Sequence, residues 1–204
     1  MPISPDAFVH ERAMVDEPCD IGAGTRVWAN AHVLKTARIG AHCNIGEGCF
    51  IEGGVSIGDH CTIKNGVAVW SGVTLSNYVF LGPHVVLTND MRPRSHPDFR
   101  TAATDWLPTP IGEGASIGAN ATIVCGNSIG AWSMIAAGAV VSHDVPPHAL
   151  VAGVPARRIA WICRCGETLK GAAAPTHTHV CGKCARRYKP LDAEPAAGLQ
   201  LVEP

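Results

Sequence analysis

The sequence predicts an all-β fold, a parallel β-helix in which short strands wind repeatedly around one axis. An aliphatic residue stands at every sixth position from Ile3 to Leu87, and the same register resumes from Ile111 to Val141. So short a unit cannot bury its apolar face alone, and its copies must stack on one another as in a solenoid. A helical period of 3.6 residues does not fit this pattern.

Glycine recurs at the second position of the six-residue unit, counted from the aliphatic residue. Because positive φ costs glycine little, we expect the chain to turn its corners at these positions. They are Gly22, Gly40, Gly46, Gly58, Gly82, Gly112, Gly118 and Gly130.

The overall composition narrows the class of protein. The chain has 204 residues, of which 47% are hydrophobic, and a formal net charge of −1. It can form one sizeable domain with a small appendage, and its balanced charge does not indicate nucleic-acid binding. The N-terminal residues do not resemble a signal peptide, and no apolar run approaches the roughly 18 residues of a membrane span. We therefore expect a cytoplasmic protein without membrane insertion.

The chain divides into a long repeat and a short C-terminal part. We expect residues 1–160 to form the β-helix. The register fails over 93–110, a polar segment with four prolines, which we expect to be an extruded loop. Such loops in a compact repeat are uncommon unless they are functional, although a tolerated surface insertion is the alternative. We expect residues 161–190 to form a ribbon-like segment and 191–204 a disordered tail.

Two cysteine pairs in the C-terminal segment have nearly the spacing of a zinc ribbon, with fifteen residues between the pairs. Four thiolates favour a closed tetrahedral zinc site, and so short a segment needs a metal to fold. The first pair has one intervening residue where the usual knuckle has two, and His177 and His179 are alternative ligands. A disulfide is the poorer alternative in the cytoplasm. We expect a structural zinc held by Cys163, Cys165, Cys181 and Cys184.

The units IGAGTR, IGEGCF, IGDHCT, IGEGAS and IGANAT resemble those of the hexapeptide-repeat acyltransferases. The resemblance implies a left-handed parallel β-helix of about seven coils, with three units in each triangular coil. It also implies a homotrimer that binds coenzyme A between two subunits. That family packs small side chains inward at the fifth position of the unit, and free cysteine is such a side chain. We therefore expect core packing for Cys19, Cys43, Cys49 and Cys61.

A second motif narrows the chemistry. The run GPHVVLTNDMRPRSH, residues 82–96, resembles the branch of the family that N-acetylates amino groups on nucleotide-linked sugars, particularly at C3. The resemblance implies an acetyl-CoA-dependent N-acetyltransferase acting on a UDP- or dTDP-linked 3-amino sugar, whose amine attacks the thioester directly. Such a transfer needs a neutral, aligned amine and a stabilised oxyanion.

The resemblance also implies catalytic and substrate-binding residues. Asn89 matches the family asparagine and is expected to orient the attacking amine. His84 is the best local candidate for a general base, although water or the departing sulfur are alternatives and a corner-packing histidine would look the same. We expect Asn65 and Asp90 to contact the substrate. Arg94 is expected to bind its diphosphate, because a guanidinium pairs with phosphate through two hydrogen bonds.

For the acyl donor, the resemblance implies that coenzyme A lies along the late coils. Ala136, Ala137 and Gly138 would offer a flat wall to the amides of the pantetheine arm. Arg157 and Arg158, in the motif GVPARRI that leaves the repeat, are expected to meet the nucleotide phosphates.

Three other functions compete with this hypothesis. An O-acetyltransferase of a small molecule would share the repeat and use a firmly placed histidine. A non-catalytic scaffold would use the zinc ribbon as an interaction module. A β-helical carbonic anhydrase needs three histidines across a subunit boundary, whereas His143 and His148 lie in the exit motif instead of on stacked units.

Overall fold

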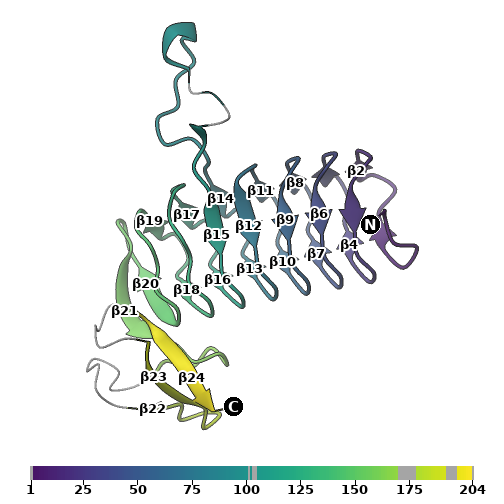
Figure 1. Cartoon of the computed structure of the whole chain (residues 1–204). Coiled ribbons are helices and arrows are strands. Elements are labelled where there is room, and N and C mark those ends of the chain that lie inside the picture. The colour runs from purple at the N-terminus through teal and green to yellow at the C-terminus, as the bar shows by residue number, and fades with distance from the viewer. Residues whose placement is uncertain (1, 101, 103–104, 170–177, 192–196, 204) are drawn as a thin grey trace.

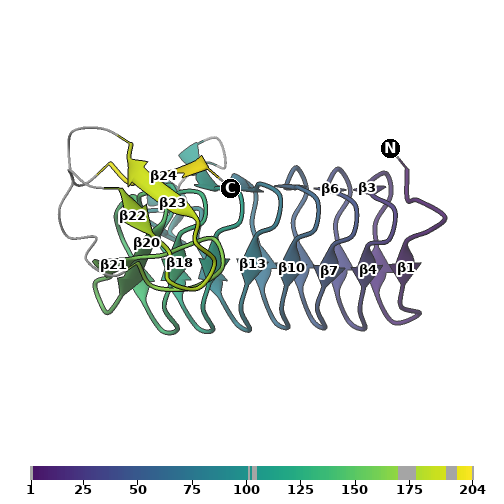
Figure 2. The ribbon, with the colours of Figure 1, turned by 90° about the horizontal axis from the view of Figure 1, so that it is seen from below.

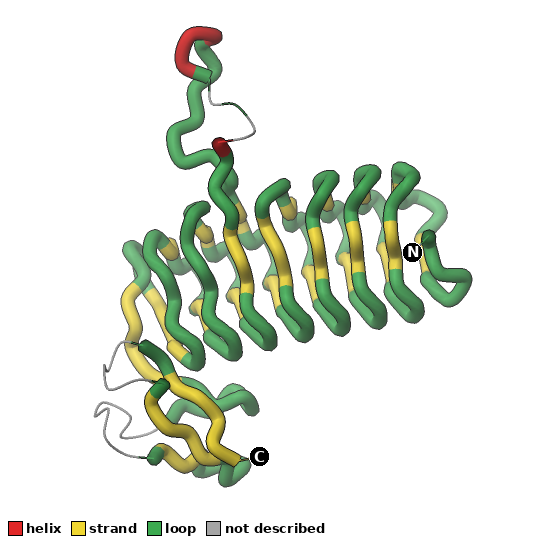
Figure 3. The backbone as a smooth tube through the Cα atoms, in the orientation of Figure 1, coloured by secondary structure: helices red, strands yellow, loops and turns green. Residues whose placement is uncertain are grey.

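The computed structural model describes residues 2–100, 102, 105–169, 178–191 and 197–203. These residues form a parallel β-helix with an arm projecting from its side and a small module at its C-terminal end (Figure 1). The predicted all-β fold is confirmed. Within the described residues, one helix has defined bounds, the short 3-10 helix η1 (Pro97–Phe99) in the arm (Figure 3).

The strands of the β-helix fall into three sheets, one on each face of a prism. The nine-stranded sheet contains, in spatial order, β1 (Phe8–Val9), β4 (Arg26–Val27), β7 (Asn44–Ile45), β10 (Thr62–Ile63), β13 (Phe80–Leu81), β16 (Ser116–Ile117), β18 (Met134–Ile135), β20 (Ala149–Ala152) and β21 (Arg157–Trp161). The seven-stranded sheet contains β19 (Val140–Val141), β17 (Thr122–Ile123), β14 (Val86–Leu87), β11 (Ala68–Val69), β8 (Phe50–Ile51), β5 (His32–Val33) and β2 (Met14–Val15). The five-stranded sheet contains β15 (Thr109–Ile111), β12 (Val73–Leu75), β9 (Ser56–Ile57), β6 (Arg38–Ile39) and β3 (Asp20–Ile21).

Each strand pairs in parallel with the strand one coil away. Val27 lies beside Ile45, its counterpart eighteen residues along the chain. Ile135 pairs with Val151, only sixteen residues further on, so the last coil is shorter by two residues. The described chain makes seven complete coils, and β20 begins an eighth before the chain reverses into the antiparallel strand β21.

The first and fifth positions of the unit point into the prism and form one continuous core. Ile45 and Ile63 at the first position are fully buried, as are most of their counterparts in other coils. Burial of such a side chain stabilises the fold by about 1.5–3 kcal/mol, and this column holds the coils together. The predicted core packing of four cysteines is confirmed, because Cys19, Cys43, Cys49 and Cys61 are 6%, 2%, 1% and 0% exposed.

The second-position glycines do not have the role that we expected. Positive φ occurs in the repeat at the fourth position instead, for example at Gly66 (φ 72°) and His84 (φ 56°). Glycine is needed at the second position for space: a Cβ atom on Gly22 would lie 2.6 Å from the amide nitrogen of Ala41 in the next coil. These glycines therefore mark close approach between coils.

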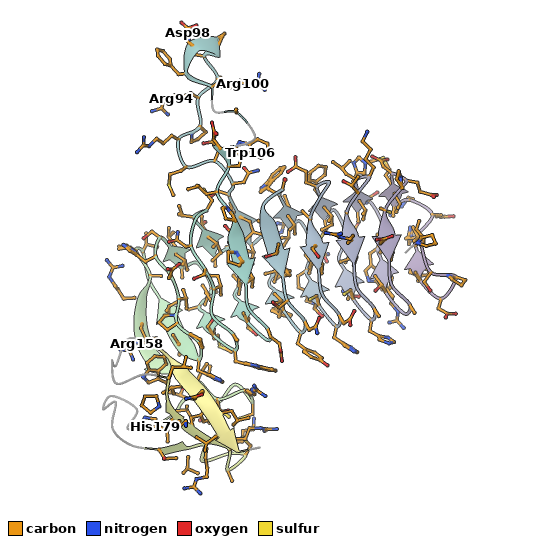
Figure 4. The ribbon with its side chains drawn as sticks, in the orientation of Figure 1. Arg94, Asp98, Arg100, Trp106, Arg158 and His179 are labelled. Atoms are coloured by element: carbon orange, nitrogen blue, oxygen red, sulfur yellow. The ribbon has the colours of Figure 1, made fainter. Side chains whose placement is uncertain are left out.

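The arm, residues 91–108, leaves the prism after β14 and returns at β15. Thr109 already pairs with Val73 of β12, so the register resumes two residues before the end of the segment expected to be extruded. Trp106 lies at the base of the arm, and Arg94 and Arg100 lie further out along it (Figure 4).

The C-terminal module packs against the last coils of the prism (Figure 2). It contains the antiparallel strands β22 (His179–Val180), β23 (Arg187–Pro190) and β24 (Leu199–Glu203). The expected disordered tail is therefore wrong over 197–203, whereas 192–196 and 204 lie outside the described residues. Leu199 is 3% exposed and its amide donates a hydrogen bond to the carbonyl of Pro147 at 3.2 Å. Burial of this leucine and pairing with β23 give the tail an ordered strand.

No helix in the described part of the chain is long and apolar enough to cross a bilayer.

Candidate functional site

The predicted site residues fall on two corners of the prism, on either side of the seven-stranded sheet. The His84 corner is the set of turns that lead from the nine-stranded sheet into the seven-stranded sheet. The Asn89 corner is the set of turns that lead from the seven-stranded sheet into the five-stranded sheet. Along either corner, equivalent residues of successive coils stack about 4.8 Å apart.

Asn89 follows β14 and joins the prism to the base of the arm. Its backbone carbonyl accepts a hydrogen bond from the amide of Leu107 at 2.9 Å. Its side chain is half-buried, and within the described residues we find no hydrogen-bond partner for the side-chain amide. The backbone of Asn89 is thus fixed while its amide is available to a ligand.

Asp90 and Arg94 make local contacts beyond Asn89. The Oδ1 atom of Asp90 accepts a hydrogen bond from the backbone amide of Arg92 at 2.8 Å, which shapes the turn into the arm. The guanidinium of Arg94 donates to the neighbouring carbonyl of Pro93 at 2.8 Å and is exposed on the arm (Figure 4).

His84 lies on the other corner, in the turn between β13 and β14. Its imidazole lies over Gly66 of the preceding coil, so close that a Cβ atom on Gly66 would be 2.5 Å from Nδ1. The backbone amide of His84 donates to the carbonyl of Asn65 at 3.1 Å. The structure therefore brings Asn65 and His84 together as exposed neighbours on this corner.

Asn89 and His84 of one chain do not converge. They are five residues apart, on opposite sides of the extended strand β14, and five extended residues span roughly 16 Å. A general base must approach the proton that it removes to within about 3 Å, directly or through one water. Within one chain, these two side chains therefore cannot act on the same amine.

A groove of about 570 Å³ lies along the Asn89 corner, on the coils that precede Asn89. Its lining residues are Asp16, Leu34, Lys35, Thr36, Glu52, Gly53, Ser71 and Trp106. We call it the Trp106 groove. Ser71 occupies the position of Asn89 one coil earlier, about 4.8 Å away along the corner. Sequence reasoning missed Trp106, and the available signal was an indole in a polar arm just before the register resumes.

The carboxylates of the Trp106 groove are already engaged by the protein. The Oε2 atom of Glu52 accepts a hydrogen bond from the amide of Ser71 at 2.7 Å. The Oδ2 atom of Asp16 lies 3.0 Å from Nε2 of His32. With these partners in place, Lys35 and the indole of Trp106 are the groups best suited to meet an anionic, planar ligand.

A second groove, of about 300 Å³, lies at the C-terminal end of the Asn89 corner. We call it the arginine groove, and its lining includes Ser142, His143, Asp144, Ala156, Arg157 and Arg158. His143 occupies the position of Asn89 two coils later, about 10 Å away. Hydrogen bonds from the backbone amide and the hydroxyl of Ser128 lower the pKa of Asp144.

The two predicted parts of the donor site also lie on different corners. Ala136, Ala137 and Gly138 form the turn between β18 and β19 on the His84 corner. A Cβ atom on Gly138 would meet nothing within 4 Å, so this backbone is open to a ligand. Arg157 and Arg158 are exposed on β21, beside the end of the Asn89 corner.

The four cysteines of the C-terminal module form one cluster. Their sulfur atoms all lie within 4.8 Å of one another. The Sγ atoms of Cys163 and Cys184 are 3.4 Å apart, and those of Cys165 and Cys181 are 3.6 Å apart. A disulfide needs about 2.05 Å, whereas Zn–S bonds of about 2.3 Å place tetrahedral sulfurs about 3.8 Å apart. The cluster has the dimensions of a four-thiolate metal site.

The electrostatic surroundings of the cluster differ from one thiol to the next. Hydrogen bonds from the backbone and guanidinium of Arg186 lower the pKa of Cys184 to about 6. Burial raises the pKa of Cys163 to about 12, although the hydroxyl of Tyr188 lies 3.1 Å from its sulfur. The thiol of Cys184 is thus largely ionised at neutral pH, whereas the buried thiol of Cys163 keeps its proton unless a cation displaces it.

Comparisons with known sequences agree with the repeat. Residues 18–53 match the six-repeat hexapeptide of bacterial transferases, and residues 36–71 and 108–143 match the hexapeptide repeat of succinyl-transferase. Over 189 residues, the chain is 45% identical to dTDP-3-amino-3,6-dideoxy-alpha-D-galactopyranose 3-N-acetyltransferase of Aneurinibacillus thermoaerophilus. This similarity covers 93% of the chain and 94% of the relative.

One solved structure with a TM-score above 0.5 shares the fold. The N-acyltransferase AntD from Bacillus cereus, in complex with dTDP and 3-hydroxybutyryl-CoA, matches with a TM-score of 0.55 at 15% identity, over 78% of this chain and 82% of that one. PerB from Caulobacter crescentus, in complex with CoA and GDP-perosamine, matches with a TM-score of 0.43 at 23% identity, over 74% of this chain. The chain spans 56% of the length of PerB.

Proposed function

The chain belongs to the hexapeptide-repeat acyltransferases, and we propose that it transfers the acetyl group of acetyl-CoA to the amino group of a nucleotide-linked 3-amino sugar. The similarity to a dTDP-3-amino sugar N-acetyltransferase over nearly the whole chain favours dTDP over UDP as the nucleotide. One geometric observation carries the assignment to a site. The Trp106 groove, Asn89 and the arginine groove lie in this order along one corner of the prism.

This order suits a reaction between two long substrates that meet end to end. The nucleotide sugar would lie in the Trp106 groove with its amino group toward Asn89 and its pyrimidine ring stacked on the indole of Trp106, and Lys35 would meet the nucleotide from the N-terminal end of the groove. Three other residues would also contact the sugar nucleotide. Asp90 would do so directly, Arg94 would reach it by movement of the arm, and Asn65 would be contributed by a second chain.

The donor would approach the reaction centre from the opposite end of the corner. Arg157 and Arg158 would bind the phosphates of coenzyme A in the arginine groove. From there the pantetheine arm would extend along the corner and place the acetyl group at Asn89, about 10 Å away. The open backbone of Ala136, Ala137 and Gly138 would contact the pantetheine from a second chain.

The chemistry is a direct acyl transfer. The amine nitrogen attacks the carbonyl carbon of the thioester, the C–N bond forms, and the C–S bond breaks as the thiolate of coenzyme A leaves. The side-chain amide of Asn89 accepts a hydrogen bond from the amine and so aligns its lone pair with the carbonyl. The amine proton passes to the leaving sulfur, through His84 of a second chain or through water.

A second copy of the chain is needed to complete this site. His84 and the Ala136–Gly138 turn lie on one corner, and Asn89 and the arginines lie on another. The outer face of the seven-stranded sheet, which lies between the two corners, is largely apolar. Met14 is 56% and Val86 is 49% exposed there, and the ring centres of Phe50 and Trp70 are 5.4 Å apart. We propose a homotrimer in which the His84 corner of one chain faces the Asn89 corner of the next.

We further propose that the cysteine cluster holds a structural zinc ion. Cys163, Cys165, Cys181 and Cys184 would fill all four positions, which leaves none for a substrate. All nine cysteines are unpaired, which fits the reducing conditions of the cytoplasm. Chelation should therefore unfold the module and leave the prism folded, because the prism has its own aliphatic core.

Assay of the purified protein with acetyl-CoA tests the proposed function directly. We expect free thiol to appear with a dTDP-linked 3-amino sugar, and the product to gain the mass of one acetyl group on nitrogen. Transfer only to the matching 3-hydroxy sugar would support an O-acetyltransferase instead. No thiol release with either acceptor would favour a scaffold.

A further inference from the structure

The strand that carries both donor arginines runs directly into the cysteine cluster. β21 ends at Trp161, and one residue, Ile162, separates it from the first cysteine. Ile162 makes two hydrogen bonds with His148. Its amide donates to the carbonyl of His148 at 2.7 Å, and its carbonyl accepts from Nδ1 of His148 at 2.9 Å. The end of β21 is thus fixed between the last coil and the module.

Trp161 connects this end of the strand to Arg158. The guanidinium of Arg158 lies 4.2 Å from the centre of the Trp161 ring, and the indole is 4% exposed. The carbonyl of Trp161 accepts a hydrogen bond from the amide of Leu169 at 2.9 Å, and Ile162 forms a β-bridge with Thr168. The turn that contains Cys163 and Cys165 therefore folds back and holds Trp161.

Two further contacts join the cluster to the prism. The hydroxyl of Tyr188 lies 3.1 Å from the sulfur of Cys163 and accepts a hydrogen bond from the amide of Arg164 at 3.0 Å. The guanidinium of Arg164 lies 4.5 Å from the centre of the Trp132 ring, in the turn before β18. Tyr188 itself is fully buried and its ring meets that of His148.

We propose that the metal-bound module positions Arg157 and Arg158 for the phosphates of the acyl donor. A metal ion that joins the four cysteines would fix the turn after Cys163, and through Leu169 and Ile162 it would fix Trp161 and the arginines before it. Without the metal, β21 would fray from its C-terminal end and the arginine groove would open. This inference rests on the proposed function, since it takes coenzyme A as the ligand of that groove.

Calorimetric titration of coenzyme A into the full-length protein, with and without zinc, tests the inference. Couplings between two sites of a protein are typically 5- to 150-fold in affinity. We expect removal of zinc to weaken coenzyme A binding by an amount in this range, and re-addition of zinc to restore it. The affinity for dTDP should not change, because the Trp106 groove lies on the N-terminal coils.

The same titration in Arg157→Ala/Arg158→Ala protein isolates the route of the effect. We expect this variant to bind coenzyme A weakly and to the same extent with and without zinc. Equal affinities of the metal-free and zinc-loaded wild type, or a zinc effect of full size in the double variant, would overturn the inference. Neither result would affect the proposed function, whereas failure of every form to bind coenzyme A would contradict the proposed function itself.

Tyr188→Phe keeps all four cysteines and removes the hydroxyl that contacts Cys163 and Arg164, so it tests this contact without removal of the metal. We expect the variant to retain zinc and to bind coenzyme A several-fold more weakly, with unchanged affinity for dTDP. Lys189→Ala, an exposed change at the residue after Tyr188 on β23, is the matched control. If Tyr188→Phe retains zinc and full affinity for coenzyme A, Tyr188 does not position the strand and the proposed route is wrong.

Discussion

The amide of Leu107 donates a hydrogen bond to the carbonyl of Asn89, which fixes the base of the arm directly beside the proposed reaction centre. Trp106 is the preceding residue and forms one wall of the Trp106 groove. The arm is thus more than an extension of the surface, because its inner end shapes the site whereas its outer end, with Phe99 68% exposed, lies away from the prism.

Trp106→Ala should therefore weaken binding of the nucleotide sugar. Stacking of a base on an aromatic ring contributes about 1–3 kcal/mol, so we expect the KM for the acceptor to rise roughly 5- to 150-fold. The KM for acetyl-CoA should not change. Steady-state kinetics with each substrate varied in turn measures both values. Tyr78→Ala is the control, because this exposed aromatic residue lies in the turn between β12 and β13 and belongs to neither corner, and an equal effect in that variant would argue against the stacking site.

The separation of His84 from Asn89 leads to a prediction about mixed oligomers. If the His84 corner of one chain completes the Asn89 site of the next, Asn89→Ala and His84→Ala chains should complement each other. In randomly mixed trimers, about one site in four would receive both intact residues, because each interface draws on two chains. The measurement is the activity of co-refolded variants compared with each variant alone. Activity no higher than the average of the two would place His84 outside the site.

His148 makes the stability of the C-terminal end depend on pH. Burial lowers its pKa from 6.5 to about 4, and the side chain is 3% exposed. As the pH falls, His148 is therefore protonated in the unfolded chain before it is protonated in the folded protein. The contribution to stability is complete above pH 6.5 and is lost between pH 6.5 and pH 4, by about 3 kcal/mol in total.

His148→Asn should remove this pH dependence, since asparagine tolerates positive φ and can donate a hydrogen bond to Ile162. Denaturant unfolding of both proteins between pH 4 and pH 7 checks the prediction. The difference in unfolding free energy should shrink as the pH falls, and a constant difference would show that His148 does not titrate on unfolding. Protonation of the cysteines cancels in this comparison because both proteins contain them.

The fold could be predicted from the sequence because one physical requirement repeats. Aliphatic residues from Ile3 to Val141 must all point into the same core, and only stacked coils satisfy a period of six residues. The reason for the glycines could not be predicted in the same way. Whether Gly22 serves φ or space depends on the distance to Ala41 in the next coil, which no local pattern contains.

The candidate site could be predicted only in part. The motif around Asn89 pointed to the corner from which the arm leaves, and the cysteine spacing pointed to a cluster that the structure assembles. The distribution of the other residues over two corners depends on three-dimensional position. His84 and Asn89 are close in sequence, yet the extended strand β14 holds them apart. Leu199 was missed because its partner β23 belongs to a module whose fold the sequence did not reveal.

The turnover of Asn89→Ala with a dTDP-linked 3-amino sugar tests the central claim most directly. If the amide of Asn89 orients the amine, its removal should lower kcat roughly 10- to 1,000-fold, which corresponds to about 1.4–4 kcal/mol of transition-state stabilisation. The melting temperature should barely change, because the side chain is half-buried at a corner and outside the core. Wild-type kinetics in Asn89→Ala protein with this acceptor would contradict the proposed active site, even though the β-helix would stand.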